Sequence, residues 1–338
     1  MENYYFLGID VSKRNLDCCL LKNGMVVRQD AIINHHKSIE KYLSKICKEQ
    51  GIEPECLAVC AEYTGMYIYP LIEACHIKNY KLWIEDPTQI KFSSGLQRGK
   101  NDTIDAKRIA LYAFRHIDRM NEYSRPSVNL EALKLLSSEL NLLCVDRKKY
   151  QAQLSDQKGY MADNIYKMKA KRLSSLIKQL DKAIASIEEE IESIITNDEV
   201  LLHQMKLLMS IEGIGRKTSL KVILETHAFT RFSDSRKFCC HAGVAPFSYL
   251  SGSSQHSRNR VSQRANKSIK SLLHLAALSA IQNKKSELRI YYDRKVAEGK
   301  NKMSVLNAIR AKLVARMFAV IRDDTQYSFN YVNPYKVN

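Results

Sequence analysis

The stretch from Val128 to Asn197 constrains the fold of this chain more than any other, because it contains no proline and only one glycine, Gly159. Along it, apolar residues recur at alternating intervals of three and four, which keeps one stripe of a helix apolar. The stripe comprises Leu133, Leu136, Leu140 and Leu143, then Leu173, Ile177, Leu180, Ile184, Ile187, Ile191 and Ile194. We predict an antiparallel helical hairpin or coiled-coil arm over residues 121–200, with two plain core helices as the alternative.

This arm divides the chain into three predicted domains. In residues 1–120, short apolar runs alternate with helical patterns, which is typical of an α/β sheet. Asn23-Gly24 is a strong hairpin signal and makes the first three strands antiparallel. Residues 201–338 are predicted to be mainly helical. The strands expected in the first domain are 3–10, two within 16–33, 56–62 and 80–86, and the helices are 37–50, 66–77 and 102–117.

The charge of the chain points to a polyanionic partner. Its 53 Lys and Arg residues outnumber its 36 Asp and Glu residues, for a net charge of +17, and such an excess favours nucleic acid. No apolar run reaches the ~20 residues that span a bilayer, and the N-terminus does not resemble a signal peptide. The nine cysteines are irregularly spaced without a CxxC pair, so we predict reduced thiols in a cytoplasmic protein with no membrane partner.

Four acidic residues stand where a metal site is expected. Asp10 ends the first predicted strand, Glu62 ends a later apolar strand, and Asp102 and Asp105 lie three residues apart at the start of a helix. Neighbouring parallel strands end side by side, and residues at i and i+3 share a helix face. Taken singly, each acid has an ordinary explanation, such as a helix cap for Asp102. Together they predict a Mg²⁺ site, with Glu85 and Asp86 as rival ligands.

The third domain carries two candidate nucleic-acid contacts. "IEGIGRKTS" reads as a helix, a Gly-Ile-Gly turn and a second helix, the pattern of a helix-hairpin-helix. A free helix N-terminus beside Arg216 and Lys217 suits a backbone phosphate, although any tight turn between helices uses glycine. Further along, a Gly/Ser-rich loop leads into a basic helix. The basic residues of this loop and helix are Arg258, Arg260, Arg264 and Lys267.

The motifs resemble those of a known family. "GIDVSK", "AEYTG" and "NDTIDAKRIA" look like the RNase H-like (RuvC-like) DEDD domain of bacterial insertion-sequence transposases, a group that includes Piv DNA invertases and bridge-RNA-guided recombinases. "FSDSRKFCCHAGVAPF" and "SGSSQHSRNRVSQRANKSIKSLLHLAALSA" resemble the C-terminal transposase domain of that family. The resemblance covers nearly the whole chain in the same order.

The resemblance implies a site and a reaction. It implies two Mg²⁺ ions at Asp10, Glu62, Asp102 and Asp105, and a serine nucleophile that maps onto Ser251. From the residues alone the neighbouring loop serines remain alternatives. A serine attacking a phosphodiester keeps the bond energy in a phosphoserine, so DNA is rejoined without another energy source.

The resemblance also implies partners. They are double-stranded DNA at the element ends and target, and a guide RNA encoded by the element. The exposed polar faces of the predicted arm suit a contact between copies of the chain, so we expect a homodimer or tetramer. Lys13, Arg98 and Lys100 join the third-domain residues as expected nucleic-acid contacts. Two other functions stay open: a RuvC-type junction nuclease that uses water, and a nucleic-acid-binding scaffold without catalysis.

Overall fold

The computed structural model describes residues 4–93, 102–232, 234–246, 250–251, 255–256, 261 and 265–328. The chain divides into two compact units, Met1–Arg125 and Pro126–Asn338. Within the described ranges, no helix combines the length and apolar character needed to cross a membrane. The three-domain division stays a prediction, and each unit is described separately below.

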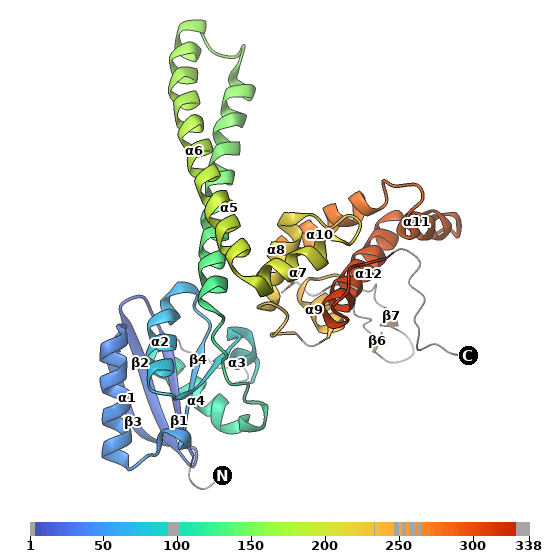
Figure 1. The fold of residues 1–338 in the computed structure, drawn as a ribbon. Coiled ribbons are helices and arrows are strands. Elements are labelled where there is room, and N and C mark those ends of the chain that lie inside the picture. The colour runs from blue at the N-terminus through green and yellow to red at the C-terminus, as the bar shows by residue number, and fades with distance from the viewer. Residues whose placement is uncertain are drawn as a thin grey trace, which may run out of the picture. The chain divides into compact units, whose positions relative to one another are not determined.

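The first unit contains a mixed five-stranded sheet (Figure 1). Its strand order is β3-β2-β1-β4-β5. Strand β1 is antiparallel to β2 and parallel to β4, β2 is antiparallel to β3, and β4 is parallel to β5. The strands are β1 (Tyr5–Val11), β2 (Asn15–Lys22), β3 (Met25–Ile33), β4 (Leu57–Glu62) and β5 (Lys81–Glu85). The predicted strands and the antiparallel start of the sheet are confirmed.

Local sequence signals explain most of these elements. The β2–β3 turn is Asn23-Gly24, and both residues have positive φ, as the favoured hairpin turn requires. Pro70 lies in the first turn of its helix, where the missing N–H has no intrahelical role. The helices of this unit are α1 (His36–Gln50), α2 (Tyr69–Ile77), α3 (Pro87–Ser93) and α4 (Asp102–Arg115), with short 3₁₀ turns at Pro54–Cys56, Gly65–Ile68 and Ile117–Arg119.

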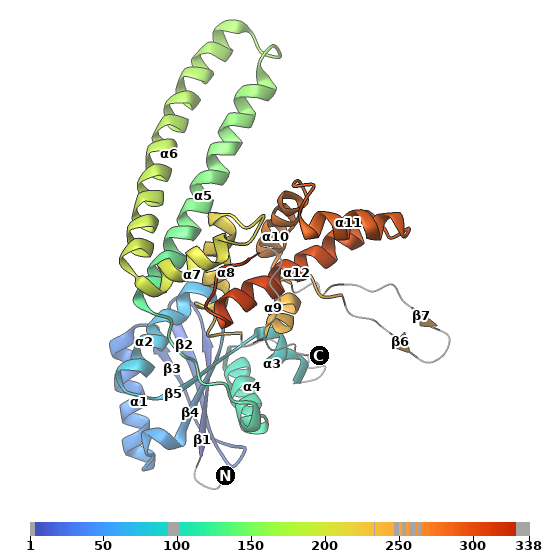
Figure 2. The same cartoon turned by 45° about the vertical axis from the view of Figure 1, so that its right-hand side comes forward.

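The sheet lies between two helical layers. Helices α1 and α2 share a core with the odd-numbered residues of β1, among them Leu7 and Ile9. Helix α4 packs on the other face, against Phe6 and Cys60. Figure 2 shows α1 and α4 on opposite sides of the sheet. Because side chains alternate along a strand, each strand supplies one set of residues to α1 and α2 and the other set to α4.

Gly8 allows α4 to lie directly on the sheet. A Cβ atom at Gly8 would lie 2.2 Å from the backbone N of Ala110 and 2.3 Å from the carbonyl O of Ala106. Both neighbours are helix backbone, which a rotamer change cannot move. The small residues on both sides therefore set the distance between helix and sheet.

Replacing Gly8 with alanine is expected to force α4 away from β1 and to lower the free energy of unfolding by about 1–3 kcal/mol, as overpacking does. Chemical denaturation of the purified protein measures this loss. Gly215→Ala is a useful comparison, because nothing lies within 4 Å of the added Cβ, and its expected loss is at most about 1 kcal/mol. Equal stabilities for Gly8→Ala and the wild type would contradict the close approach.

The second unit begins with two long helices, α5 (Val128–Gln157) and α6 (Asp163–Asn197). They run side by side as a hairpin (Figures 1 and 2), and Gly159 lies in their connection with φ of 84°. The predicted helical hairpin is confirmed, whereas its supercoiling stays a prediction. Ile184, Ile187 and Ile191 are buried as expected, but the last buried residue is Ile195 rather than Ile194. A straight helix drifts from a strict heptad repeat, which accounts for this change.

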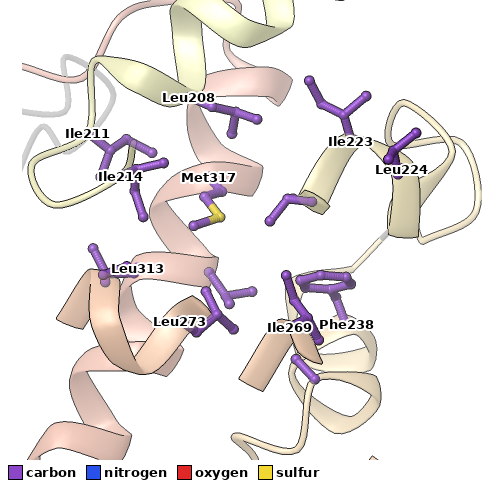
Figure 3. Close-up of a cluster of buried hydrophobic side chains, with 14 of the residues drawn as sticks. Leu208, Ile211, Ile214, Ile223, Leu224, Phe238, Ile269, Leu273, Leu313 and Met317 are labelled. Atoms are coloured by element: carbon purple, nitrogen blue, oxygen red, sulfur yellow. The ribbon is translucent and has the colours of Figure 1, made fainter. Parts of the chain in front are cut away.

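The rest of this unit is mainly helical, as predicted, and has one apolar core (Figure 3). Side chains from α7, the following turn, α8, α9, α10 and α12 meet there, and Phe238 and Leu313 are completely buried. The helices are α7 (Glu199–Met209), α8 (Arg216–Thr226), α9 (Ser235–His241), α10 (Lys267–Ala280), α11 (Glu287–Ala297) and α12 (Lys302–Arg322). A strand pair, β6 (Leu250–Ser251) and β7 (Gln255–His256), lies between α9 and α10 in sequence.

Candidate active site

Four carboxylates form a row across the sheet of the first unit. Asp10 of β1 is opposite Asp17 of β2, and Glu62 of β4 is opposite Glu85 of β5. The β1–β4 register pairs Ile9 with Ala61, so Asp10 and Glu62 follow as neighbours. Adjacent strands lie about 4.8 Å apart. Strand pairing therefore places an acid from each of four strands at the same level of the sheet.

The row lies on the face that α4 covers. Phe6, Cys60 and Trp83 belong to the apolar cluster that includes α4, and each is two or four residues from an acid of the row, so alternation gives these acids the same face. The Tyr112 hydroxyl of α4 donates to Glu85 Oε2 at 2.9 Å, which agrees with this assignment.

Asp102 is near the row and Asp105 has a partner of its own. Asp102 lies one turn before Ala106, which packs over Gly8, so it shares the helix face that meets the sheet. Asp105 Oδ1 accepts a hydrogen bond from Arg108 Nη1 at 2.6 Å. This ion pair is the ordinary role that the i,i+3 spacing also allows.

The electrostatics of this face favour a cation. Burial and the nearby Asp102 carboxylate raise the pKa of Asp17. Burial, followed by the carboxylates of Glu85 and Glu62, raises the pKa of the Cys60 thiol. Burial is the larger cause of both shifts, and the neighbouring carboxylates add a negative potential that disfavours a further negative charge. A divalent cation would relieve it.

The residues fit a hard metal ion in chemistry, although they do not form a complete metal site here. Carboxylate oxygens are the ligands that Mg²⁺ prefers, and the row supplies only carboxylates. Among the residues that the structure describes, no three His, Cys, Asp or Glu side chains converge closely enough to bind an ion. The metal site predicted at Asp10, Glu62, Asp102 and Asp105 therefore remains a prediction, with strand pairing and α4 bringing its members to one region.

Asp17 is the acid that sequence reasoning missed. The sequence feature that could have revealed Asp17 is the short connection from Ser12 to Arg14. This connection fixes the β1–β2 register and places Asp17 opposite Asp10. The two rival ligands separate in the structure: Glu85 belongs to the row, whereas Asp86 Oδ1 accepts the Thr88 N–H at 2.7 Å at the start of α3.

The Gly-Ile-Gly turn has a helix on either side, α7 and α8, whereas the helix-hairpin-helix motif stays a prediction. The first glycine of the turn has a packing role. Gly213 has φ of 85°, and a Cβ there would lie 2.6 Å from the carbonyl O of Ala276 in α10. Gly215 precedes α8 as its N-cap and has open space around it. Arg216 forms an ion pair with Glu192 of α6, whereas Lys217 is exposed. Whether this turn binds a phosphate stays a prediction.

A cleft of about 760 Å³ adjoins this turn. Its walls include the backbone from Met209 to Gly215, together with Asn283, Lys285 and Tyr327. Asn283 Nδ2 donates to Glu212 Oε1 at 2.8 Å and so fixes one wall. The cleft offers both a cation and an acid, which leaves its ligand open.

Ser251 lies in β6 and pairs with Gln255 of β7, so the predicted Gly/Ser loop contains a short hairpin. Lys267 is the first residue of α10 and is exposed, and Lys13 is exposed in the β1–β2 connection. The remaining predicted contacts lie outside the described residues: Arg98, Lys100, Arg258, Arg260 and Arg264.

Glu225 of α8 is a partly buried carboxylate with several polar partners. Burial alone would raise its pKa, but hydrogen bonds from His241 and Lys221 outweigh burial and lower the pKa from 4.5 to about 2. Burial, with the nearby Arg231 and Lys134, lowers the pKa of His227 to about 4, and the Glu225 carboxylate offsets part of this shift. A carboxylate with a lowered pKa stabilises the fold above its unfolded pKa, and this contribution is lost as the pH falls through the folded pKa.

The free energy of unfolding of the wild type is therefore expected to fall more steeply between pH 4.5 and pH 2 than that of Glu225→Gln. Once Glu225 is ionised in both the folded and unfolded states, its own titration no longer changes the difference between the two proteins. Denaturant titrations at a series of pH values measure this. Parallel curves down to pH 2 would contradict the low pKa.

Comparisons with known proteins agree with these features. A family model described as "Transposase IS116/IS110/IS902 family" matches residues 205–293. A second model, the DEDD model for IS110 elements described as "Transposase", matches residues 7–157. Together the two models match most of the chain. The first spans the α7–α8 turn and Ser251, and the second spans the carboxylate row.

Two relatives match nearly the whole chain, and a third matches less than half of it. The pilin gene-inverting proteins of Moraxella bovis and Moraxella lacunata are each 25% identical over 327 residues, covering 95% of this chain and 97% of theirs. An uncharacterized 43.6 kDa protein of insertion element IS110 from Streptomyces coelicolor is 27% identical over 158 residues, covering 46% of this chain and 38% of its own.

Among solved structures, RuvC of Thermus thermophilus is found in complex with a Holliday junction substrate and alone. The identities are 11% and 12%, the TM-scores are 0.28 and 0.26, and the matches cover 36% and 35% of this chain and 99% of each RuvC chain. TM-scores this low do not establish a shared fold. The RuvC-like classification of residues 1–120 stays a prediction, while its mixed sheet is confirmed.

Proposed function

Because the chain belongs to the IS116/IS110/IS902 family of transposases, we propose that it cuts and rejoins DNA at the ends of a bacterial insertion sequence and at its target. One observation carries the proposal: the row of Asp10, Asp17, Glu62 and Glu85, which four strands assemble beneath α4. Carboxylate oxygens gathered at one level of the sheet are the ligands that a hard divalent cation prefers. The activity is thus metal-dependent phosphodiester chemistry in the cytoplasm.

Asp10, Glu62, Asp102 and Asp105 are the residues that would hold Mg²⁺, and two ions suit this number of carboxylates. A bound ion of this kind stabilises negative charge on the attacking and leaving oxygens of a phosphodiester. For Asp105 this role requires release from Arg108. The freed guanidinium of Arg108 then becomes available to a phosphate.

Ser251 is the proposed nucleophile. Its hydroxyl oxygen attacks the phosphorus of the scissile phosphodiester, the bond to the displaced sugar oxygen breaks, and that oxygen leaves with the proton. The product is a phosphoserine, which a second DNA end reverses by attacking with its own hydroxyl. Position supports this assignment, because Ser251 lies in a hairpin within the matched transposase region. Arg258 and Arg260 follow closely in sequence and would neutralise the phosphate.

The positive charge of the chain suits the two nucleic acids involved. DNA near the carboxylates would be bound by Lys13, Arg98 and Lys100. In the second unit, the phosphate backbone of the nucleic acid would be bound by Arg216, Lys217, Arg264 and Lys267. A guide RNA encoded by the element would select the sequence by base pairing. The helical hairpin of α5 and α6 would join copies of the chain into a dimer or tetramer.

Site-specific inversion is the second candidate, and the two Moraxella relatives favour it because they are pilin gene-inverting proteins that match 95% of this chain. Inversion and transposition use the same cut and rejoining and differ in the placement of the sites. A plasmid carrying two sites in opposite orientation distinguishes them, because only inversion flips the intervening segment without loss of DNA.

The proposal is tested by purifying the protein from its host, sequencing any RNA that copurifies, and assaying recombination on DNA carrying the element ends. We expect an RNA that matches the non-coding flank of the gene, and recombinant joints that disappear after ribonuclease treatment. Full activity of the RNA-free protein would remove the guided mechanism. A protein that binds DNA and forms no joint with or without RNA would favour the non-catalytic scaffold.

A further inference from the structure

The two ends of the segment that carries Ser251 meet at one point of the second unit. Helix α9 ends at His241 before this segment, and α10 begins at Lys267 after it. The Asn266 N–H donates to the His241 carbonyl O at 2.9 Å. Residues 241 and 266 are therefore in contact, although 24 residues separate them in sequence.

Glu225 joins both ends through its side chain. Its Oε1 accepts a hydrogen bond from Asn266 Nδ2 at 2.9 Å, and its Oε2 lies 3.0 Å from His241 Nε2. Lys221 Nζ, one turn earlier in α8, lies 2.8 Å from Oε1. The Glu225 side chain is only 15% exposed, so these bonds form largely away from water, where a lost partner is most harmful.

Asn266 has a second task that fixes its orientation. Its Oδ1 accepts the N–H groups of Ser268 and Ile269 and so caps α10. The amide nitrogen can then point only to Glu225. We call the set of Glu225, His241 and Asn266 the clasp.

Two further contacts stabilise the region where the segment between α9 and α10 begins and ends. Asn307 Nδ2 of α12 donates to the Val244 carbonyl O at 2.8 Å, just after α9. A Cβ at Gly243 would lie 2.4 Å from the Cβ of Ala265. The backbone just after α9 therefore packs closely against the residue just before the cap of α10. The clasp thus belongs to a packed base rather than to an isolated surface pair.

We propose that Glu225 is a positioning residue for the serine nucleophile: by holding His241 and Asn266 together, it fixes the base from which Ser251 is presented to the scissile phosphodiester. This inference rests on the proposed function of Ser251. Glu225 itself touches no reacting atom. Misplacement of a reacting group by about 1 Å can reduce a rate roughly a hundredfold, so a carboxylate that acts only through the clasp still affects catalysis.

The most direct test reverses donor and acceptor in the hydrogen bond between Asn266 and Glu225. Asn266→Asp keeps the cap of α10, because Asp and Asn cap equally well, but it turns a carboxylate toward Glu225. We expect the clasp to open and the single-turnover rate of adduct formation on element-end DNA to fall roughly 10- to 100-fold. The double variant Glu225→Gln with Asn266→Asp restores an amide–carboxylate bond with its direction reversed, and its rate is expected to return to within about threefold of the wild type.

Three measurements separate positioning from general structure. Asn266→Asp is expected to lower the thermal midpoint, because two carboxylates then face each other largely away from water, so its rate is measured well below that midpoint. Its affinity for the same DNA is expected to stay near wild type. Asn141→Asp, at an exposed position of α5, adds the same charge, serves as the matched control and is expected to leave the rate unchanged. If Asn266→Asp proves too unstable to assay, the double variant is compared with Glu225→Ala, which cannot form the clasp. A folded double variant with a near wild-type rate supports the positioning role. A double variant as slow as Glu225→Ala contradicts it.

A wild-type rate in Asn266→Asp, with an adduct that still depends on Ser251, would overturn the positioning role and leave the proposed function intact. A wild-type protein that forms no Ser251-dependent adduct would instead overturn the proposed function, and the positioning role with it.

Discussion

Replacement of Ser251 with alanine is expected to abolish the denaturation-resistant protein–DNA adduct and to reduce recombination by at least about a thousandfold, as loss of a nucleophile does. Alanine lacks the hydroxyl that forms the phosphoserine. DNA binding is expected to be unchanged, because the positive charge remains. The adduct is measured after denaturation, on labelled DNA that carries an element end.

Ser253→Ala and Ser254→Ala are the matched controls for this result, since both remove a hydroxyl from the same sequence region. Each is expected to retain the adduct. If the adduct survives in Ser251→Ala and disappears in one of the controls, the nucleophile is a different loop serine. Strand cutting that persists in Ser251→Ala without any adduct would instead favour a nuclease that uses water.

Replacement of Asp10 with asparagine is expected to lower metal-dependent strand cleavage by at least about a hundredfold, because a neutral amide oxygen binds Mg²⁺ much less well than a carboxylate. Asp10 lies between Asp17 and Glu62 in the row, so it is the acid with most to contribute to a shared ion. Cleavage is measured against Mg²⁺ concentration and after removal of metal with a chelator.

The same substitution has a second readout that does not depend on cleavage. Added Mg²⁺ is expected to stabilise the wild type more than the variant. Asp163→Asn, in the first turn of α6, is the control for loss of an exposed charge. Undiminished cleavage in Asp10→Asn, or in the presence of chelator, would exclude this site.

Much of the fold follows from patterns within short stretches of the sequence. The strand–helix alternation, the Asn23-Gly24 hairpin and the long helical hairpin depend on residues within a few positions of one another, and the structure confirms all three. The turn at Gly213 was also anticipated, although its glycine is required by Ala276 of α10. That contact joins residues 63 positions apart, which no local pattern reveals.

The sequence by itself determined most of the elements of the first unit, the long helical hairpin, the positive charge and every candidate acid except Asp17, because each is a property of composition or of local periodicity. Tertiary structure alone decided which acids stand together. Strand register brought Asp17 and Glu85 into the row with Asp10 and Glu62 and turned Asp86 to the start of α3. It also decided that Glu225 closes the base of the serine segment, because hydrogen bonds between distant residues exist only once the helices have packed.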